Sequence, residues 1–504
     1  FDINYLEVLG NNTFEYCLYH LLENDEILSD FHTRYKNKSV GRKAYPPALL
    51  LRVIFYAYYR GHTSSRVIER LCKTDLKFIA LAAGRQPHFT TIANFVSSNC
   101  EAMGKLFHKV LLICDQSGLI GKEHFAIDGC KLPTNASKQW SGTHKELRKK
   151  SDKLKEAAKK IIDKHLSSDS DKDSAGNIPD NHQQTIDTLM KNASKIDDFL
   201  STNEPRMGQG RRKQEVQSNI TDNQSAKMTT SKGTIQGMAC VTAADEKHQV
   251  IVHAQAFGMR QEQAALKPMV EGIKKNFGDN IFKPSLVLTA DTGFSSEATM
   301  QYLFDEKINA VVPDNQFRKR NPVFSDSDFY KKHKALRKKT RKDQSGRDEV
   351  FHSSIFTVNL DNNSCICPAG KEMLFQGDHF EGARGIYSRF RGKLRDCRDC
   401  DLQTQCMKKP VKDQGRQVSF LNEEQEKVTC LDLMKQKIDS PEGRRMYSRR
   451  MWTIEPVFGN ITSNKGLSRI SVRGEAKATA QWLMYCMVHN IEKLWKNSEV
   501  ESWA

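Results

Sequence analysis

The chain has 504 residues, enough for roughly two to four domains. Its 78 lysines and arginines exceed its 61 aspartates and glutamates, and the net charge of +17 favours a polyanionic partner, nucleic acid before an anionic membrane surface. No stretch approaches the ~20 apolar residues of a transmembrane helix, so we expect no membrane span. The start, FDINYLEVLG, lacks the features of a signal peptide, and thirteen mostly scattered cysteines indicate reduced thiols. We therefore expect a cytoplasmic, nucleoid-associated protein.

Residues 1–120 are predicted to be helical. The stretch AYPPALLLRVIFYAYYRG has apolar residues at helical spacing and ends at Gly61, and PHFTTIANF begins a further helix with Thr90 or Thr91 as its N-cap. Short helices joined by tight turns fit a helix-turn-helix-like module that reads DNA, and they fit a dimerisation bundle equally well. Both functions stay open for this domain.

An α/β fold, with a mixed sheet flanked by helices, is predicted for the middle of the chain. Residues 121–143 contain the strand-like HFAIDG, and residues 215–316 contain GTIQGMACVTAAD and HQVIVHAQAF, which form an antiparallel pair around a polar turn. The apolar run KPSLVLTADTGF follows, then a helix and the strand INAVVPD. Residues 144–214 interrupt this core with a charged helical pattern, which is typical of an inserted helical hairpin.

Residues 317–439 are predicted to form a second insertion, basic and containing cysteines. Residues 318–347 hold twelve lysines and arginines against three acids, a density that favours contacts with phosphate. The expected contacts are Arg318, Lys319, Arg320, Arg337, Lys338 and Lys339. Residues 350–410 look poor in strands.

Residues 440–504 are predicted to close the core with helices. Ser440 is the expected N-cap of one helix, with Pro441 at its first position, and GEAKATAQWLMYCMVHNIEKLWKN is a final amphipathic helix.

Three acidic residues are candidates for a shared site. Asp128 in FAIDG and Asp291 in LVLTADTG each end an apolar strand and are followed within two positions by Gly. Taken singly, each is more simply a turn residue, and Glu455 in YSRRMWTIEPVFG is more simply a surface residue of its helix. Ligands bind at the strand ends of α/β sheets, however, so the joint pattern favours function.

Converging carboxylates indicate a metal site. Mg²⁺ prefers oxygen ligands, whereas unpaired acids brought together without metal repel each other, which raises a pKa. Two such ions about 3.5 to 4 Å apart activate the attacking oxygen and stabilise the leaving one in phosphodiester cleavage. In a chain of net charge +17, a cluster of acids therefore predicts metal-dependent chemistry on a polyanion.

The order of motifs resembles bacterial insertion-sequence DDE transposases, which have an RNase H-like catalytic core and a third acid in a helix with upstream Tyr and Arg. The resemblance spans nearly the whole chain through YPPALLLRVIFYAYYRGHTSSRVIE, HFTTIANF, FAIDGCKLPTNAS, TDNQSAKM, LTADTGFSS, CPAGK, CRDCDLQTQC, RRMWTIEPVFGNITSNKGLSRISVRG and MVHNIEKLW. It implies an enzyme that binds the terminal inverted repeats of its element, cleaves phosphodiesters at the ends and transfers the 3′-hydroxyl to target DNA. It also implies a homodimer on two DNA ends. The alternative is a catalytically silent DNA-binding regulator derived from a transposase.

The resemblance implies a catalytic, metal-binding triad of Asp128, Asp291 and Glu455, with two Mg²⁺ or Mn²⁺ ions. It also implies that Tyr447 and Arg450 contact the DNA end.

This chain departs from the family signature around Glu455. The family places an Arg four residues before the Glu, where this chain has Met451, so Arg449 and Arg450 are both candidates. The family's Lys a few residues after the Glu is missing, and Lys465 is the nearest. Trp452, beside the Glu, is a candidate to stack on an unpaired base.

The cysteine cluster is a candidate structural zinc site. Cys365, Cys367, Cys397 and Cys400 would supply four thiolates, with Cys406 beyond them. The middle gap of 29 residues is longer than that of a usual zinc ribbon, so unligated reduced thiols are the alternative. With zinc, the site would hold an insertion that contacts DNA.

Overall fold

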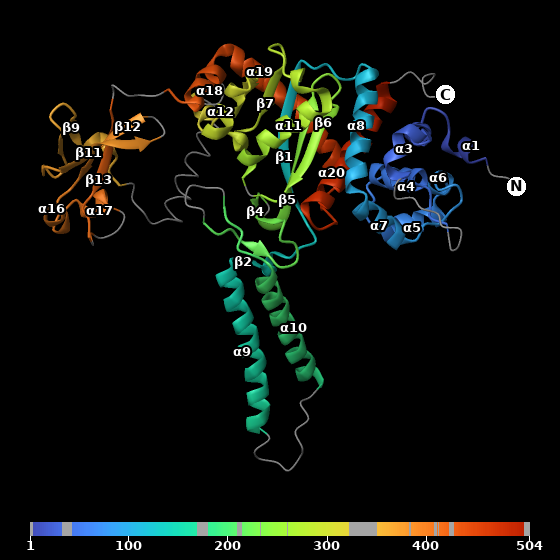
Figure 1. Cartoon of the computed structure of the whole chain (residues 1–504), viewed down its shortest axis with the longest axis horizontal. Helices are drawn as coiled ribbons and strands as arrows, with labels where there is room; N and C mark the ends of the chain where they lie inside the picture. The colour runs from blue at the N-terminus through green and yellow to red at the C-terminus, as the bar shows by residue number, and fades with distance from the viewer. Residues whose placement is uncertain are drawn as a thin grey trace, which may run out of the picture. The chain divides into compact units, whose positions relative to one another are not determined.

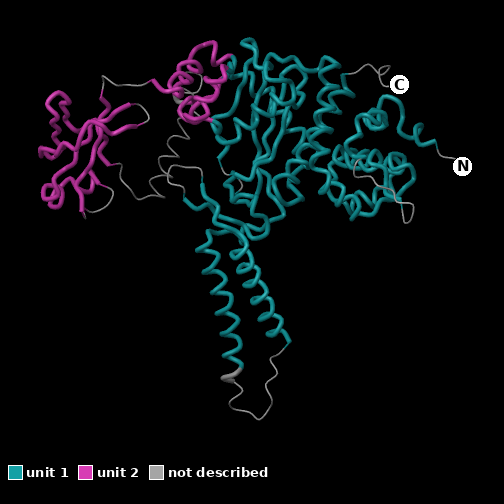
Figure 2. Tube along the Cα trace, viewed as in Figure 1, with its two compact units in different colours: residues 1–294, 308–310, 446–504 teal, residues 295–307, 311–445 magenta. Residues whose placement is uncertain are grey.

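The computed structural model of the chain describes residues 4–32, 43–168, 180–208, 214–231, 233–259, 261–321, 350–382, 385–407, 411, 413–422 and 428–497. The chain forms two compact units (Figure 2). Unit 1 consists of residues 1–294, 308–310 and 446–504, and unit 2 of residues 295–307 and 311–445. No helix among the described residues has the length and hydropathy needed to cross a membrane. The predicted DNA contacts Arg337, Lys338 and Lys339 lie outside the described residues.

Helices make up the start of unit 1, where the sequence predicted them. They are α1 (Tyr5–Leu9), α2 (Phe14–Leu21), α3 (Asp25–His32), α4 (Pro47–Tyr59), α5 (Ser65–Thr74), α6 (Leu76–Leu81), α7 (Phe89–Ser98) and α8 (Cys100–Gln116). Both α4 and α8 pack against α20 (Glu475–Asn497), which is buried along most of its length. The ring of Tyr58 on α4 stacks on that of Tyr485 on α20 with centroids 4.4 Å apart. Helix α20 is therefore a core helix, and α4 and α8 dock onto it.

A mixed six-stranded sheet follows, with strand order β4-β5-β1-β7-β8 and β6 also paired with β5 (Figure 1). Its strands are β1 (His124–Pro133), β4 (Ala226–Thr230), β5 (Gly233–Asp245), β6 (Ile251–Phe257), β7 (Val287–Ala290) and β8 (Ala310–Val311). The predicted antiparallel pair is β5 and β6, while β1 runs antiparallel to β5 and parallel to β7.

Helices flank this sheet. Helix α11 (Leu266–Phe277) and α20 both pack against β6. Asn490 of α20 donates to the carbonyl of Ile251 at 2.9 Å and accepts from its N–H at 2.8 Å, so the helix is tied to the strand backbone. The fold is therefore α/β with a mixed sheet, as predicted.

The predicted charged helices are α9 (His144–Ser168) and α10 (Asp180–Thr202), which run side by side from the sheet (Figure 1). They are joined at their base by Leu147, Ile196 and Phe199, where β2 (Ser141–Gly142) pairs with β3 (Ser218–Asn219). Short 3₁₀ segments at Lys138–Trp140, Glu262–Ala265, Asp279–Ile281 and Thr292–Phe294 complete unit 1, with a π-helical turn at Asn460–Asn464.

Unit 2 contains a small β structure, so the expectation that residues 350–410 are poor in strands is wrong. Its strands are β9 (Thr357–Asn359), β10 (Ser364–Ile366), β11 (Leu374–Gly382), β12 (Gly385–Arg391) and β13 (Gln417–Leu421). Its helices are α12 (Glu297–Asp305), α13 (Phe317–Arg320), α16 (Leu394–Arg398), α17 (Gln403–Cys406) and α18 (Cys430–Asp439), with a 3₁₀ turn at Ser353–Ile355. Register shifts in the β11–β12 hairpin break the apolar alternation by which strands are read from a sequence.

Helix α19 (Pro441–Gly459) begins where the sequence predicted. The hydroxyl of Ser440 accepts a hydrogen bond from the N–H of Gly443 at 3.0 Å, which is the geometry of an N-cap. Near its other end the helix contains Pro456, which has no N–H to donate, and the π-helical turn follows directly.

Candidate active site

Asp128 and Asp291 occupy neighbouring positions on the sheet. The parallel pairing of β1 with β7 ends at the pair Ile127 and Ala290, and the two acids are the next residues of the two strands. Asp291 directly follows β7, at a strand end, as predicted. The register of the sheet therefore brings together two acids that are 163 residues apart in the chain.

Asp128, in contrast, does not end its strand, which corrects the sequence-based expectation. Strand β1 continues to Pro133 because β5 keeps pairing with it, and Asp128 lies opposite Thr242. The chain does not turn away at the following glycine either, since Gly129 is paired with Val241. A Cβ at Gly129 would lie 3.2 Å from Cγ2 of Val241, so the close approach of β5 accounts for the small residue.

Arg450 of α19 holds both acids. Its guanidinium lies 2.7 Å from Oδ2 of Asp128 and 3.9 Å from Oδ1 of Asp291. Tyr447, one turn earlier on the same face, donates its hydroxyl to Oδ1 of Asp291 at 3.4 Å. The arginine side chain is 9% exposed and that of Asp128 is 24% exposed. Of the two candidate arginines, Arg450 is thus the one at the acids.

Burial and charge act in opposite directions on this pair. Burial raises the pKa of the Asp128 carboxyl, and the neighbouring Arg450 only partly offsets that rise. Burial lowers the pKa of Arg450, but the charges of Asp128, Tyr447, Asp291 and Glu455 outweigh it and leave the pKa raised. Asp128 is therefore a carboxylate whose charge is costly unless a cation stays beside it.

Glu455 lies on the same helix as Arg450, and its side chain is exposed. Its charge reaches Arg450, as the raised pKa of that arginine shows. Among the described residues no three His, Cys, Asp or Glu side chains are arranged to hold a metal ion. The structure thus gathers Asp128 and Asp291 around Arg450 and leaves Glu455 exposed on the helix that carries Arg450.

A second cluster, which the sequence reasoning missed, surrounds Glu246 at the end of β5. Arg449 forms a two-point ion pair with Glu246, in which its Nε donates to Oε1 at 2.8 Å. The indole N–H of Trp452 donates to the same oxygen at 3.1 Å, although 58% of the residue is exposed. Glu246 belongs to the polar turn after a strand, which read as a turn only, so the sequence held no signal for this role.

Glu262 is a further acid near Asp128 that was not predicted. It pairs with Lys131 at 3.1 Å, and its charge contributes to the raised pKa of Asp128. A Cβ on Gly293 would lie 2.2 Å from Oε2 of Glu262, so a larger residue there would displace that carboxylate. The Gly of the ADTG motif therefore makes room for a carboxylate.

Other predicted DNA contacts are engaged within the protein. Lys465 is 2% exposed and paired with Glu492, so the structure places it in the interior. In unit 2 Arg320 pairs with Asp314 at 2.6 Å and with Asp439 at 2.5 Å. Its neighbour Arg318 is exposed, and Lys319 lies in α13, its side chain outside the described part of the chain.

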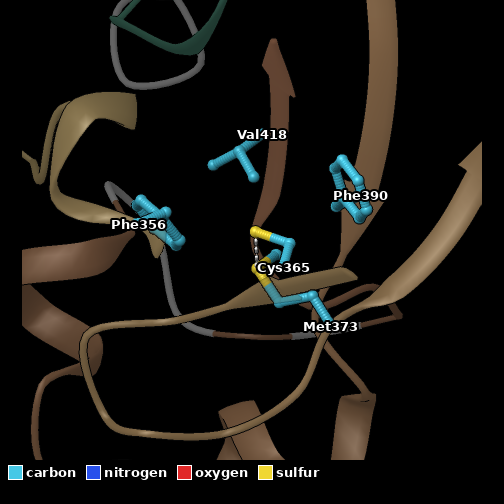
Figure 3. Packing of buried hydrophobic residues seen from close by; sticks show 5 residues of the cluster. All are labelled: Phe356, Cys365, Met373, Phe390 and Val418. Atoms are coloured by element: carbon cyan, nitrogen blue, oxygen red, sulfur yellow. Dashed lines mark hydrogen bonds between the residues drawn. The ribbon is translucent and has the colours of Figure 1, made fainter. Parts of the chain in front are cut away.

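The predicted zinc ligand Cys365 lies in the hydrophobic core of unit 2 with Phe356, Met373, Phe390 and Val418 (Figure 3). Its thiol contacts the sulfur of Met373 at 3.7 Å.

Comparison with known proteins adds two family matches. A family described as a transposase DDE domain matches residues 366–495, and one described as a transposase domain (DUF772) matches residues 4–98. The first includes Glu455 and the second the N-terminal helices. Both agree with the predicted resemblance to insertion-sequence transposases, which is confirmed. No curated protein matches the sequence.

Among solved structures, the chain is similar to the piggyBac transposase synaptic complex with hairpin DNA, determined by cryo-EM. The sequence identity is 10% and the TM-score 0.34, with 99% of this chain and 79% of that chain covered. A TM-score this low does not establish a shared fold.

Proposed function

We propose that this chain, which carries the sequences of two transposase domains, is a metal-dependent DNA transposase with an RNase H-like core. It binds the terminal inverted repeats of its own element, cleaves phosphodiester bonds at the ends and transfers the 3′-hydroxyl to target DNA. The observation that carries the proposal is the placement of Asp128 and Asp291 on adjacent strands, both beside Arg450 of the helix that bears Glu455. The mixed sheet that sets this register supports the RNase H-like assignment.

The donor chemistry fits a divalent ion. Asp128, Asp291 and Glu455 offer only carboxylate oxygens, the ligands that Mg²⁺ and Mn²⁺ prefer, and two of them already share a cation in Arg450. We propose that these three acids hold two ions. When bound, such ions activate the attacking oxygen and stabilise the leaving oxygen of an in-line displacement.

The residues around the acids would position the DNA. Arg450 and Tyr447 lie at the acids and are placed to contact a phosphate next to the scissile bond. Glu246, which is paired with Arg449, accepts a hydrogen bond from the exposed indole N–H of Trp452, and this leaves the ring face available to an unpaired base. The side-chain amide of Gln249 donates a hydrogen bond to the backbone carbonyl of Trp452 at 2.9 Å.

Double-stranded DNA is the partner that the charge supports. A net charge of +17 attracts a polyanion and makes its binding dependent on salt. Because both ends of an element must be processed together, we propose a homodimer on two DNA ends. A silent regulator derived from a transposase is disfavoured, since such a protein has no use for three acids on the elements that carry them here.

The test is cleavage of a labelled duplex that carries the sequence flanking the gene. We expect strand cleavage with Mg²⁺, none with EDTA, and a loss of at least about 100-fold in Asp291→Asn, because a ligand of the ions is removed. The matched control is Asp279→Asn, an exposed aspartate in a 3₁₀ segment of the same unit, which should cleave normally. Sequence-specific binding without cleavage in any divalent metal would favour the silent regulator.

A further inference from the structure

The remaining cysteines of the cluster meet at one pocket of unit 2. Cys367, Cys397, Cys400 and Cys406 all line it, whereas Cys365 does not. The lining of the pocket thus selects these four cysteines.

The long gap in the sequence between Cys367 and Cys397 is closed by the β11–β12 hairpin. Its antiparallel register pairs Leu374 with Arg391, so the chain leaves and returns at the same place. Met373 at the start of the hairpin and Gly392 after it both line the pocket. The gap of 29 residues, which is longer than that of a usual zinc ribbon, therefore contains a hairpin whose two ends lie at the pocket lined by the thiols.

Each side of the pocket presents its thiols on tight backbone turns. In CPAGK the N–H of Gly370 donates to the carbonyl of Cys367 at 2.8 Å, and Gly370 has a φ of 72°, which favours glycine. On the other side the side-chain amide of Gln403 donates to the backbone carbonyl of Cys397 at 2.8 Å. The backbone N–H of Gln403 donates to the carbonyl of Cys400 at 2.9 Å.

The thiol of Cys397 is fixed between two glycines. A Cβ on Gly392 would lie 2.7 Å from its sulfur, and one on Gly415 would lie 2.9 Å from it. These glycines come from different loops, which are joined by the hydrogen bond from Gly392 N–H to the Arg416 carbonyl at 2.8 Å. At Gly392 the sulfur is the nearest atom to such a Cβ, whereas at Gly415 the nearest is the carbonyl oxygen of Gly392 at 2.2 Å, so the close approach of the two loops also excludes larger residues there.

We propose that Cys367, Cys397, Cys400 and Cys406 form a structural zinc site. Four thiols lose their protons to solvent and form four bonds to one tetrahedral Zn²⁺, so no oxidant or reductant is needed. Among the described residues no three of these side chains are arranged to hold a metal ion, so the proposed site requires the sulfurs to move together when zinc binds. The pocket is also lined by three basic residues, Lys371, Lys393 and Arg416, whose positive charges would offset the negative charge of a four-thiolate site.

A small core gives the reason for such a site. The buried residues that hold the β structure of unit 2 together are Phe356, Cys365, Met373, Phe390 and Val418. These five side chains, with six partly buried ones packed against them that include Cys367 and Cys406, form a small core for about 70 residues, and small domains of this kind are commonly stabilised by a metal. The site is independent of the proposed DNA chemistry, because all its ligands lie in unit 2 and the acids lie in unit 1.

The experiment uses the full chain, expressed with added zinc and purified without chelator. We expect one zinc per chain by elemental analysis and, after exchange for Co²⁺, the absorption bands of thiolate charge transfer and of tetrahedral Co²⁺. Cys406→Ala should lose the zinc, whereas Cys406→His, which supplies a replacement ligand, should keep it with weaker thiolate bands. The matched control Cys365→Ala should keep the zinc with unchanged bands, since Cys365 is a core residue.

The results that would overturn the site are equally specific. They are a wild-type chain without zinc, a Co²⁺ form without thiolate bands, or full zinc retention by Cys406→Ala. If Cys365→Ala loses the zinc and Cys406→Ala retains it, the ligands are the four predicted from the sequence, with Cys365 in place of Cys406. If Cys406→Ala unfolds unit 2, its loss of zinc does not test the ligand assignment. The Cys406→His variant then provides the test, because it supplies a replacement ligand.

Discussion

The guanidinium of Arg450 lies 2.7 Å from the carboxylate of Asp128, and the arginine side chain is 9% exposed. An internal cation thus lies beside the acid that we propose as a metal ligand. Asp128 is a carboxylate for which burial raises the pKa, so its charge depends on a cation close by. The metal and Arg450 would therefore compete for Asp128 when DNA is absent.

This competition predicts the effect of removing the arginine. In Arg450→Ala a divalent ion no longer has to displace an internal partner of Asp128, so Mn²⁺ should bind the DNA-free protein about tenfold more tightly, which corresponds to about 1.4 kcal/mol. The measurement is Mn²⁺ titration by electron paramagnetic resonance. Arg449→Ala is the control, because Arg449 pairs with Glu246 and not with the acids. Equal or weaker Mn²⁺ binding by Arg450→Ala would show that the two cations do not share a site.

The exposed indole of Trp452 predicts a role in DNA binding and none in folding. Trp452→Ala should weaken binding of a DNA end with an unpaired terminal base by about 5- to 150-fold, since stacking on one base is worth about 1–3 kcal/mol. Thermal unfolding should be nearly unchanged, because 58% of the residue is exposed. Met451, exposed on the same helix, provides the control variant Met451→Ala. Fluorescence anisotropy with a labelled duplex measures both, and equal affinities for the two variants would exclude stacking.

The buried pair of Lys465 and Glu492 predicts an effect on stability instead of on DNA binding. Lys465→Met should lower the free energy of unfolding by about 3 kcal/mol at pH 7, because it leaves a buried carboxylate without its closest partner. Lys496→Ala removes the exposed partner of the same carboxylate and should cost less than about 1 kcal/mol. A large loss of DNA affinity in folded Lys465→Met would restore the sequence-based expectation of a DNA contact.

The same pair predicts a dependence on pH. Hydrogen bonds from Asn460, Lys465 and Lys496 outweigh burial and lower the pKa of Glu492 to about 2. A carboxyl whose folded pKa is lowered stabilises the protein above its unfolded pKa of about 4.3, and this contribution is lost as the pH falls toward 2. The difference in stability between wild type and Glu492→Gln, measured by urea unfolding, should therefore shrink between pH 5 and about pH 3. A difference that stays constant across this window would contradict the assignment.

DNA binding should depend steeply on salt. If lysines and arginines neutralise phosphates, the logarithm of the association constant falls linearly with that of the salt concentration, with a slope of about −0.9 for each phosphate contacted. Titrations at several salt concentrations should give a slope steeper than about −4. A flat response would remove the electrostatic account based on the net charge of +17.

The sequence predicted the elements better than their contacts. Apolar alternation and capping located β5, β6 and the start of α19, because these signals are local. The end of β1 could not be predicted at Pro133, since it is β5 that extends the strand beyond Asp128. The neighbourhood of Asp128 and Asp291 depends on a strand register that no local pattern encodes.

The site chemistry was limited in the same way. Spacing in the sequence could not decide whether Arg449 or Arg450 lies at the acids. The structure decides it, because the side chain of Arg450 reaches Asp128 whereas that of Arg449 reaches Glu246. Glu246 and Glu262 are isolated acids in the sequence, and they gain roles only through partners far along the chain. Spacing also favoured Cys365 over Cys406, because the strand that buries Cys365 was not expected.

The central claim is that Asp128, Asp291 and Glu455 hold metal together, and iron-mediated cleavage of the protein tests it most directly. Fe²⁺ bound in place of Mg²⁺ reacts with added hydrogen peroxide, with ascorbate to reduce the Fe³⁺ formed, and generates hydroxyl radicals that cut the backbone close to the ion; mass spectrometry locates the cuts. With the DNA end bound, we predict cuts near all three acids that excess Mg²⁺ suppresses and Asp128→Asn abolishes. Cuts confined to other segments, or cuts near residue 455 that survive in Asp128→Asn, would contradict a shared site.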